Sequence, residues 1–300
     1  MSYTTQDLID TIKRKAFIPS TQSTFQDADI LAIATDELRD NIVPEILKTR
    51  EEYFLVSVDL QVDPSLGYVR IPSRAIGGAV REVSIVSGDS EYNLARMSIE
   101  DKVYANGYSG DGFYIQGNKI YMMSNQACTV RVYFHVRPSV LVLPSAAIQV
   151  TGIDRDTGVI TTGSIPSSWG SSAVVDLIEN NAGFDLLGLD VTCTVGTGQL
   201  TLDTADIPAE LAVGDWISLR DTSPVPQIPV ELFPYLAQSV IVQILESVGD
   251  IEASAKAEKK LNDIKDQVLS MVTPRVKGEA KLFVPAKNRG ALSSKWTNRR

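Results

Sequence analysis

The chain has 300 residues, of which 44% are hydrophobic and 22% charged, and its formal net charge is −9. This length and composition are ordinary for a soluble globular protein of one large domain or two to three smaller ones. The polar first residues and the lack of an apolar run near ~18 residues predict a protein kept in a cytoplasm, with no membrane partner. The acidic balance disfavours a main surface that binds nucleic acid, which needs clustered Lys and Arg.

The N-terminal part of the chain is predicted to be helical. Residues 6–17 carry an amphipathic pattern with basic residues near the end, which is typical of a short helix. A longer helix is predicted from Thr24, which with Asp27 has the pattern of a capping box. Pro44 is expected to kink or interrupt this second helix, because proline lacks a backbone N–H.

Two β segments are predicted to follow. From about Leu55 the apolar residues recur every second position, and Asp-Pro, Gly and Gly-Gly turns separate strand-length runs. These features predict an antiparallel first β insertion over residues 55–143. Short strands at roughly 8–12-residue spacing favour a small sandwich or barrel as the second β insertion, over residues 144–222.

Helices are predicted again near the C-terminus. Four prolines between residues 224 and 234 predict a stiff extended connector, and amphipathic helices follow it as far as Pro274. Helical stripes at both ends cannot be buried alone, so residues 1–54 and 228–273 are expected to form one discontinuous α-helical bundle. The predicted fold class is α+β: this bundle, the two antiparallel insertions, and an extended arm over residues 274–300.

The sequence offers little that suggests catalysis. His135, the single histidine, falls in a strand pattern and is expected to be a packed side chain. Asp154 and Asp156 have calcium-loop spacing, but glycine and isoleucine stand at later ligand positions, which favours a β-turn. Cys128 and Cys193 are far apart and indicate free thiols. We therefore expect no enzymatic activity, no cofactor and no metal.

The last segment differs sharply from the rest of the chain. Residues 275–300 contain eight basic residues and one acid, a net charge of +7, whereas residues 1–274 carry −16. If extended, about 26 residues could span about 85 Å, enough to reach a neighbouring protein. Its apolar pieces, such as KLFV, could add a strand to a sheet edge. The residues expected to dock are Arg275, Lys277, Lys281, Leu282, Phe283, Val284, Lys287, Arg289, Lys295, Trp296, Arg299 and Arg300.

Three stretches resemble the head-to-tail adaptor (connector, or neck) proteins of tailed bacteriophages. They are GYVRIPSRAIGGAVREVSI, TVRVYFHVRPSVLV, and the segment from SPVPQIPVELFP through the lysine-rich helix to VTPRVKG. The resemblance implies a structural virion protein that assembles in the host cytoplasm into a ring, typically of twelve copies. Such a ring docks on the portal protein at the capsid vertex, the arm reaching into the portal. It receives tail or nozzle proteins, and genomic DNA passes through its lumen without specific binding.

Three other interpretations remain open. The basic arm could bind nucleic acid through a salt-dependent contact with phosphates, although only Phe283 and Trp296 could stack on bases. The central β region could be a host-surface or glycan-binding module. The arm could also be a disordered segment that only increases solubility.

Overall fold

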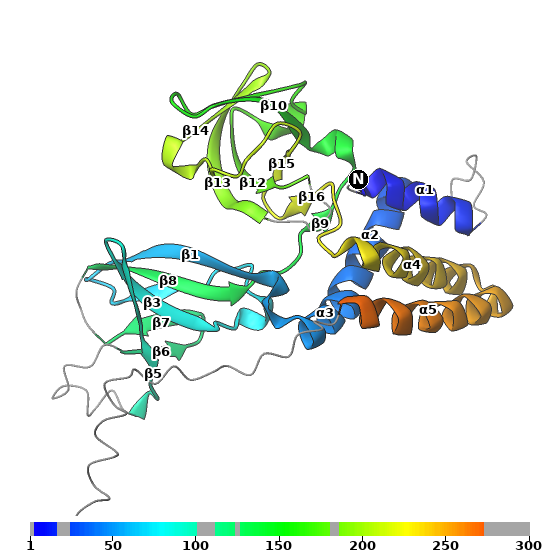
Figure 1. Cartoon of the computed structure of the whole chain (residues 1–300), viewed down its shortest axis with the longest axis horizontal. Helices are drawn as coiled ribbons and strands as arrows, with labels where there is room; N and C mark the ends of the chain where they lie inside the picture. Colours follow the sequence, from blue (N-terminus) through cyan, green and yellow to red (C-terminus); the bar gives the residue numbers. More distant parts are fainter. Residues whose placement is uncertain (1–2, 17–24, 101–111, 124–126, 181–185, 273–300) are drawn as a thin grey trace, which may run out of the picture.

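The computed structural model describes residues 3–16, 25–100, 112–123, 127–180 and 186–272, and it has a mixed α+β fold (Figure 1). The helices lie on one side of the molecule, and two β units lie on the other, one above the other in Figure 1. Within the described ranges, no helix is both long enough and apolar enough to cross a bilayer.

Helices from the two ends of the chain pack side by side, with α4 in contact with α1, α2 and α5, and α3 in contact with α5. The bounds of the α-helices are α1 (Thr5–Lys15), α2 (Asp27–Glu37), α3 (Val43–Thr49), α4 (Phe233–Val248) and α5 (Ile251–Val272). The shorter helical elements among them are η1 (Leu38–Ile42), η2 (Glu51–Phe54) and η9 (Val230–Leu232).

The interruption predicted at Pro44 takes the form of a π-helical turn, η1, between α2 and α3. In this turn the N–H of Val43 donates to the carbonyl of Leu38, five residues earlier. A widened turn relieves the clash between a proline ring and the carbonyl four residues before it. The cap predicted at Thr24 was wrong, because α2 begins at Asp27 and its N-cap is Gln26, which forms a capping box with Asp29. Thr24 itself lies outside the described residues.

The first β unit contains two four-stranded sheets. One has the order β1-β8-β3-β4, and its strands are β1 (Leu55–Val62), β8 (Cys128–His135), β3 (Glu82–Ser87) and β4 (Ser90–Asn93). The other has the order β2-β7-β6-β5, and its strands are β2 (Tyr68–Arg70), β7 (Lys119–Met122), β6 (Gly112–Gln116) and β5 (Ala95–Arg96). The pairs are antiparallel as predicted, except for β5 with β6, which run parallel.

The second β unit is a closed six-stranded barrel. In barrel order its strands are β10 (Ile148–Asp154), β11 (Val159–Thr162), β14 (Gln199–Leu202), β13 (Leu186–Gly196), β12 (Ser172–Ile178) and β15 (Trp216–Leu219). Closure leaves no unpaired sheet edge in this unit. The turn predicted at Asp154 and Asp156 is confirmed between β10 and β11: the Asp154 carboxylate accepts the Asp156 N–H at 3.1 Å.

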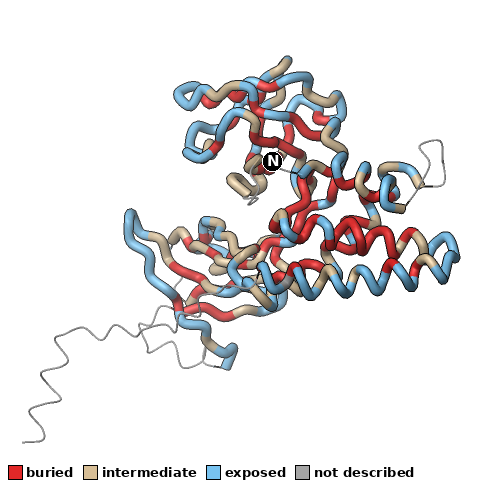
Figure 2. Tube along the Cα trace, turned by 45° about the vertical axis from the view of Figure 1, so that its right-hand side comes forward, coloured by how far each residue is buried: buried red, intermediate tan, exposed pale blue. Residues whose placement is uncertain are grey.

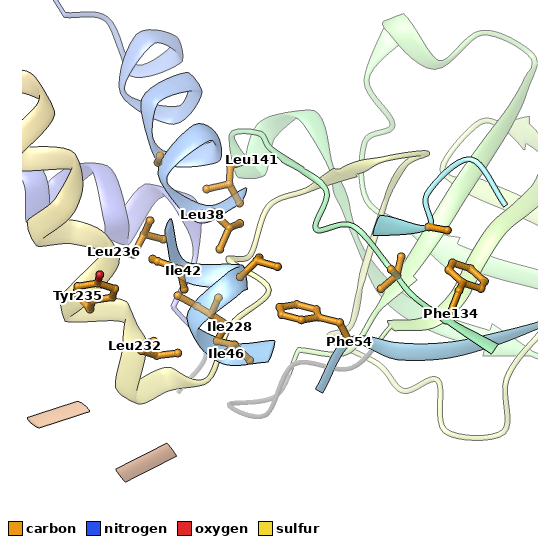
Figure 3. Packing of buried hydrophobic residues seen from close by; sticks show 14 of the residues in the cluster. Leu38, Ile42, Ile46, Phe54, Phe134, Leu141, Ile228, Leu232, Tyr235 and Leu236 are labelled. Carbon is orange, nitrogen blue, oxygen red and sulfur yellow. The ribbon is translucent and has the colours of Figure 1, made fainter. Parts of the chain in front are cut away.

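The apolar cores of the two β units differ in their connections (Figure 2). One buried cluster runs from the helices into the first β unit without interruption, and Figure 3 shows Phe54 of η2 between the helix residues Ile42 and Ile46 and Phe134 of β8. The barrel encloses a separate cluster. A third, small cluster contains Ala147, Ile178, Trp216 and Val225, where the barrel meets the proline-rich segment.

The proline-rich segment is not the free connector that the sequence predicted. Residues 224–229 lack helix and strand, as expected, but residues 223–229 are all buried. The segment leaves the short parallel pair β9 (Val140–Leu141) and β16 (Thr222–Ser223) and fills the space between barrel and helices. It is also tied to the N-terminal helix, because the Thr5 N–H donates to the Pro224 carbonyl at 2.8 Å. Val225 and Ile228 supply the apolar surface that keeps it packed.

Candidate functional site

The residues predicted to dock, from Arg275 to Arg300, lie outside the described residues, since the last described helix ends at Val272. Docking through this arm therefore stays a prediction. The described part of the chain has a different noteworthy cluster, which lies where the helices, the first β unit and the barrel meet.

This junction, as we call it, consists of Arg39, Arg74, Arg220, Asp176, Asp190 and Asp221 with the polar residues Ser139 and Gln227. At its centre, Arg74 of the first β unit is 4% exposed. Its Nη1 donates to Asp176 Oδ2 of the barrel at 2.6 Å, and its Nη2 donates to Ser139 Oγ at 2.7 Å. A buried charge is tolerated only when it is paired and hydrogen-bonded, and this guanidinium meets both conditions through Nη1 and Nη2. Its buried Nε lies 3.6 Å from Asp221 Oδ1 without forming a hydrogen bond.

The Asp176 carboxylate holds two irregular points of the barrel backbone in place: a bulge within β13 and the turn that follows β15. It has no exposed surface, and it accepts the backbone N–H of Asp190 and the backbone N–H of Asp221, each at 3.1 Å. Asp190 and Asp221 are the described non-glycine residues with positive φ, 56° and 60°. Left-handed backbone is costly for a residue with a side chain, so these hydrogen bonds help to maintain both the bulge and the turn.

Two further arginines balance the charge of the outer aspartates. Arg220 Nη2 lies 3.0 Å from Asp190 Oδ2, and Arg39 Nη2 of η1 lies 3.8 Å from Asp221 Oδ1. Arg39 also donates to the Pro138 carbonyl, at 3.1 Å from Nε and 2.9 Å from Nη2. Three arginines thus face three aspartates, and the cluster links helix, sheet and barrel with no net charge.

The proline-rich segment contributes the last polar contact of the junction. Gln227 Oε1 accepts the Ser139 N–H at 2.8 Å, and Gln227 Nε2 donates to Ser139 Oγ at 3.1 Å. Burial raises the pKa of Asp176, while the Arg74 guanidinium and the Asp190 N–H oppose that shift. The arginines and aspartates of the junction are ion-paired with one another. The junction is therefore suited to fixing the relative positions of the helices, the first β unit and the barrel.

The other residues considered from the sequence are dispersed. His135 lies on β8 opposite Leu55, Cys128 begins the same strand, and Cys193 is buried in the barrel. Over the part of the chain that the structure describes, no three His, Cys, Asp or Glu side chains come together in a way that could hold a metal ion. Trp216 is buried in the small third cluster.

Sequence reasoning missed the junction because its central partners are 102 residues apart. Nothing in the local pattern around Arg74 or Asp176 distinguishes them from surface charges. The available signal was indirect. Asp176 lies within the otherwise apolar run SAVVDLI, and a charged residue inside a strand that is buried on both sides has to be paired.

Searches against protein-family models and against curated proteins found no match. What the structure establishes is the class: a mixed α+β protein with a closed six-stranded barrel and a two-sheet β unit, connected at a buried charged junction.

Proposed function

We propose that this chain is a structural virion protein of the head-to-tail adaptor type and not an enzyme. In this proposal the helices within residues 1–54 and 228–273 act as one bundle that carries the two β units. Copies of the chain form a ring, of twelve if the resemblance holds, in the neck between capsid portal and tail. The segment 274–300 docks on the portal, and the ring receives tail or nozzle proteins.

The observation that carries the proposal is the junction. A connector has to keep its two attachment surfaces at a fixed separation while partners pull on both. Buried charge pairs tolerate little displacement, because moving Arg74 away from Asp176 would leave both charges buried and unpaired. A barrel fixed in this way, with buried residues 223–229 in place of a free linker, is suited to transmitting position between partners.

The charge distribution is consistent with the same role. Residues 1–274 carry −16 and residues 275–300 carry +7, so the arm is electrostatically distinct from the body. An acidic lumen wall would repel DNA phosphates, which would let DNA pass without being held.

Removal of residues 275–300 tests the proposal directly. We expect the truncated chain to keep the far-ultraviolet circular dichroism and melting temperature of the full chain but to lose association with the portal protein in co-purification. A matched control keeps the arm's length and apolar residues and replaces only its eight basic residues with Ser and Gln, which separates charge from apolar docking. Retained attachment of the folded truncated chain would contradict arm docking.

Imaging of the purified protein, alone and on particles, tests the ring. Absence of any ring in both samples would contradict the adaptor role. Titration of the arm peptide with duplex DNA against salt, and of the full chain with glycans, tests the alternatives: tight DNA binding by the arm or glycan binding by the β units would favour those functions instead.

A further inference from the structure

A basic hollow of about 690 Å³ lies between the end of α1 and the hairpin of α4 and α5. Four cations surround it: Arg14, Lys15, Lys256 and Lys260. Its other lining residues are mostly apolar, including Ile241, Leu245 and Ala257, together with the polar Gln238 and one acid, Asp250. Val248, which is 60% exposed, follows Leu245 by about one turn and extends this apolar surface toward the tip.

The cations of this hollow are largely unpaired. Lys256 pairs with Glu252 across one turn of α5, at 2.6 Å, but Arg14, Lys15 and Lys260 have no ion-pair partner in the described part of the chain. Burial lowers the pKa of Lys15, and the neighbouring charges of Lys260 and Arg14 lower it further. In a body with a strong negative charge, such a cluster has an affinity for an acidic group, and its apolar lining favours a protein segment over a bare phosphate chain.

The same chain carries an acidic segment of complementary character. The acidic stripe, Asp29, Asp36 and Asp40, is exposed along α2 and η1, with the exposed Ala32 and half-buried Ile33 between its members. Asp36 and Asp40 have no ion-pair partner among the described residues. The opposite side of α2, with Ile30 and Ala34, is buried in the contact with α4.

This arrangement excludes contact between the stripe and the hollow of the same copy. Because α2 packs on α4 through its buried side, its acidic side faces away from α4 and from the hollow that α4 helps to form. The two complementary surfaces can meet only between copies. A contact between two different surfaces is heterologous, and such contacts extend into rings or open chains.

We propose that the acidic stripe on α2 and η1 of one copy docks in the basic hollow between α1, α4 and α5 of a second copy. The inference rests on the proposed function only in taking a second copy as the partner. The contact forms between partly exposed charges, so the association weakens steeply with added salt.

A charge swap tests this contact. Lys260→Glu in the hollow and Asp36→Lys in the stripe are each expected to weaken self-association at low salt by about tenfold or more, measured by analytical ultracentrifugation over a range of concentrations. The chain that carries both substitutions is expected to regain much of the association, because the reversed charges attract again. Lys259→Glu and Glu258→Lys, on exposed positions of α5 outside the lining of the hollow, are the matched controls and are expected to leave association unchanged.

The inference would be overturned by a wild-type chain that stays monomeric at every concentration, by single variants that associate normally, by a swapped chain that is not restored, or by displacement of the second copy by duplex DNA that binds the hollow. Circular dichroism of each variant shows whether it is folded. If the Asp36→Lys variant still forms rings on the portal as the wild-type chain does, this contact is overturned but the adaptor role is not. Restoration by the swap without any ring in images would support the contact and contradict the adaptor role.

Discussion

The first β unit shares one apolar core with the helices, whereas the barrel encloses a core of its own. The barrel meets the rest of the molecule through the charged junction, through a small apolar cluster, and through Leu186 and Leu189 of β13, which pack against the shared core. Apolar packing is roughly additive over area and tolerates small shifts, while a buried ion pair depends on particular atoms. The comparison indicates that the barrel is the more self-sufficient unit and that its orientation depends on few contacts.

The largest expected effect comes from removing the centre of the junction. Arg74→Met leaves the buried Asp176 carboxylate without its counter-charge, and we expect a loss of about 3–5 kcal/mol in the free energy of unfolding, measured in urea. Arg131→Met is the control, since it breaks a partly exposed ion pair with Asp59 and is expected to cost about 1 kcal/mol or less. If Arg74→Met lowers the free energy of unfolding no more than Arg131→Met does, the comparison is refuted.

A second variant separates the charge from the hydrogen bonds of the junction. Adding Asp176→Leu to Arg74→Met removes both buried charges, so part of the lost stability is expected to return. Full recovery is not expected, because the N–H groups of Asp190 and Asp221 then lose their acceptor.

Next in size are cavity substitutions in the two cores. Leu200→Ala in the barrel and Ile42→Ala in the shared core each remove a side chain with no exposed surface and are each expected to cost about 2–5 kcal/mol. Hydrogen exchange should show faster exchange confined to the barrel for Leu200→Ala, but extending from the helices into the first β unit for Ile42→Ala. If faster exchange spreads equally through the whole molecule from both substitutions, the core of the barrel is not separate from the shared core.

Glycines in two turns give a smaller contrast. Gly158, in the barrel turn between β10 and β11, has φ +73°, and a Cβ there would lie 2.3 Å from the Leu202 carbonyl oxygen. Gly158→Ala is expected to lower stability by about 1–3 kcal/mol through backbone strain. Gly88, in the turn between β3 and β4, also has positive φ, 57°, but nothing within 4 Å of a built Cβ, so Gly88→Ala is expected to cost about 1 kcal/mol. Thermal melts of the two variants provide the measurement.

The smallest expected effect is a pH dependence in the helices. The hydrogen bond from Lys265, at 3.0 Å, lowers the pKa of Glu45, which joins α3 to α5. The folded state then binds fewer protons than the unfolded state, so this stabilisation is present above the ordinary glutamate pKa of about 4.3 and is lost as the pH falls through the lowered value. Lys265→Met should flatten the acid side of a plot of urea midpoint against pH, and an unchanged slope would contradict this assignment.

Much of the secondary structure could be predicted from local patterns. The stripe in α1, the long amphipathic α5 and the alternation in β8 follow directly from the spacing of apolar residues. The burial of residues 223–229 could not, because proline content determines backbone conformation and says nothing about what packs on the segment.

The sites were harder to predict for a related reason. The junction joins residues far apart in sequence. Lys256 and Lys260 of α5 border a hollow whose other wall is the end of α1. Charge type can be read from a sequence, but a partner contributed by another element cannot.

The hydrogen bond from the Thr5 N–H to the Pro224 carbonyl joins a residue made early in synthesis to one made late, which bears on how the chain folds as it is made. The N-terminal helices and the first sheets emerge from the ribosome long before α4 and α5, which cover part of their apolar surface. The barrel strands, by contrast, pair within one continuous stretch and can close early, since local contacts form fast. We expect the growing chain to carry a finished barrel beside an unfinished core, so that chaperone demand and aggregation fall mainly on the earlier-made half.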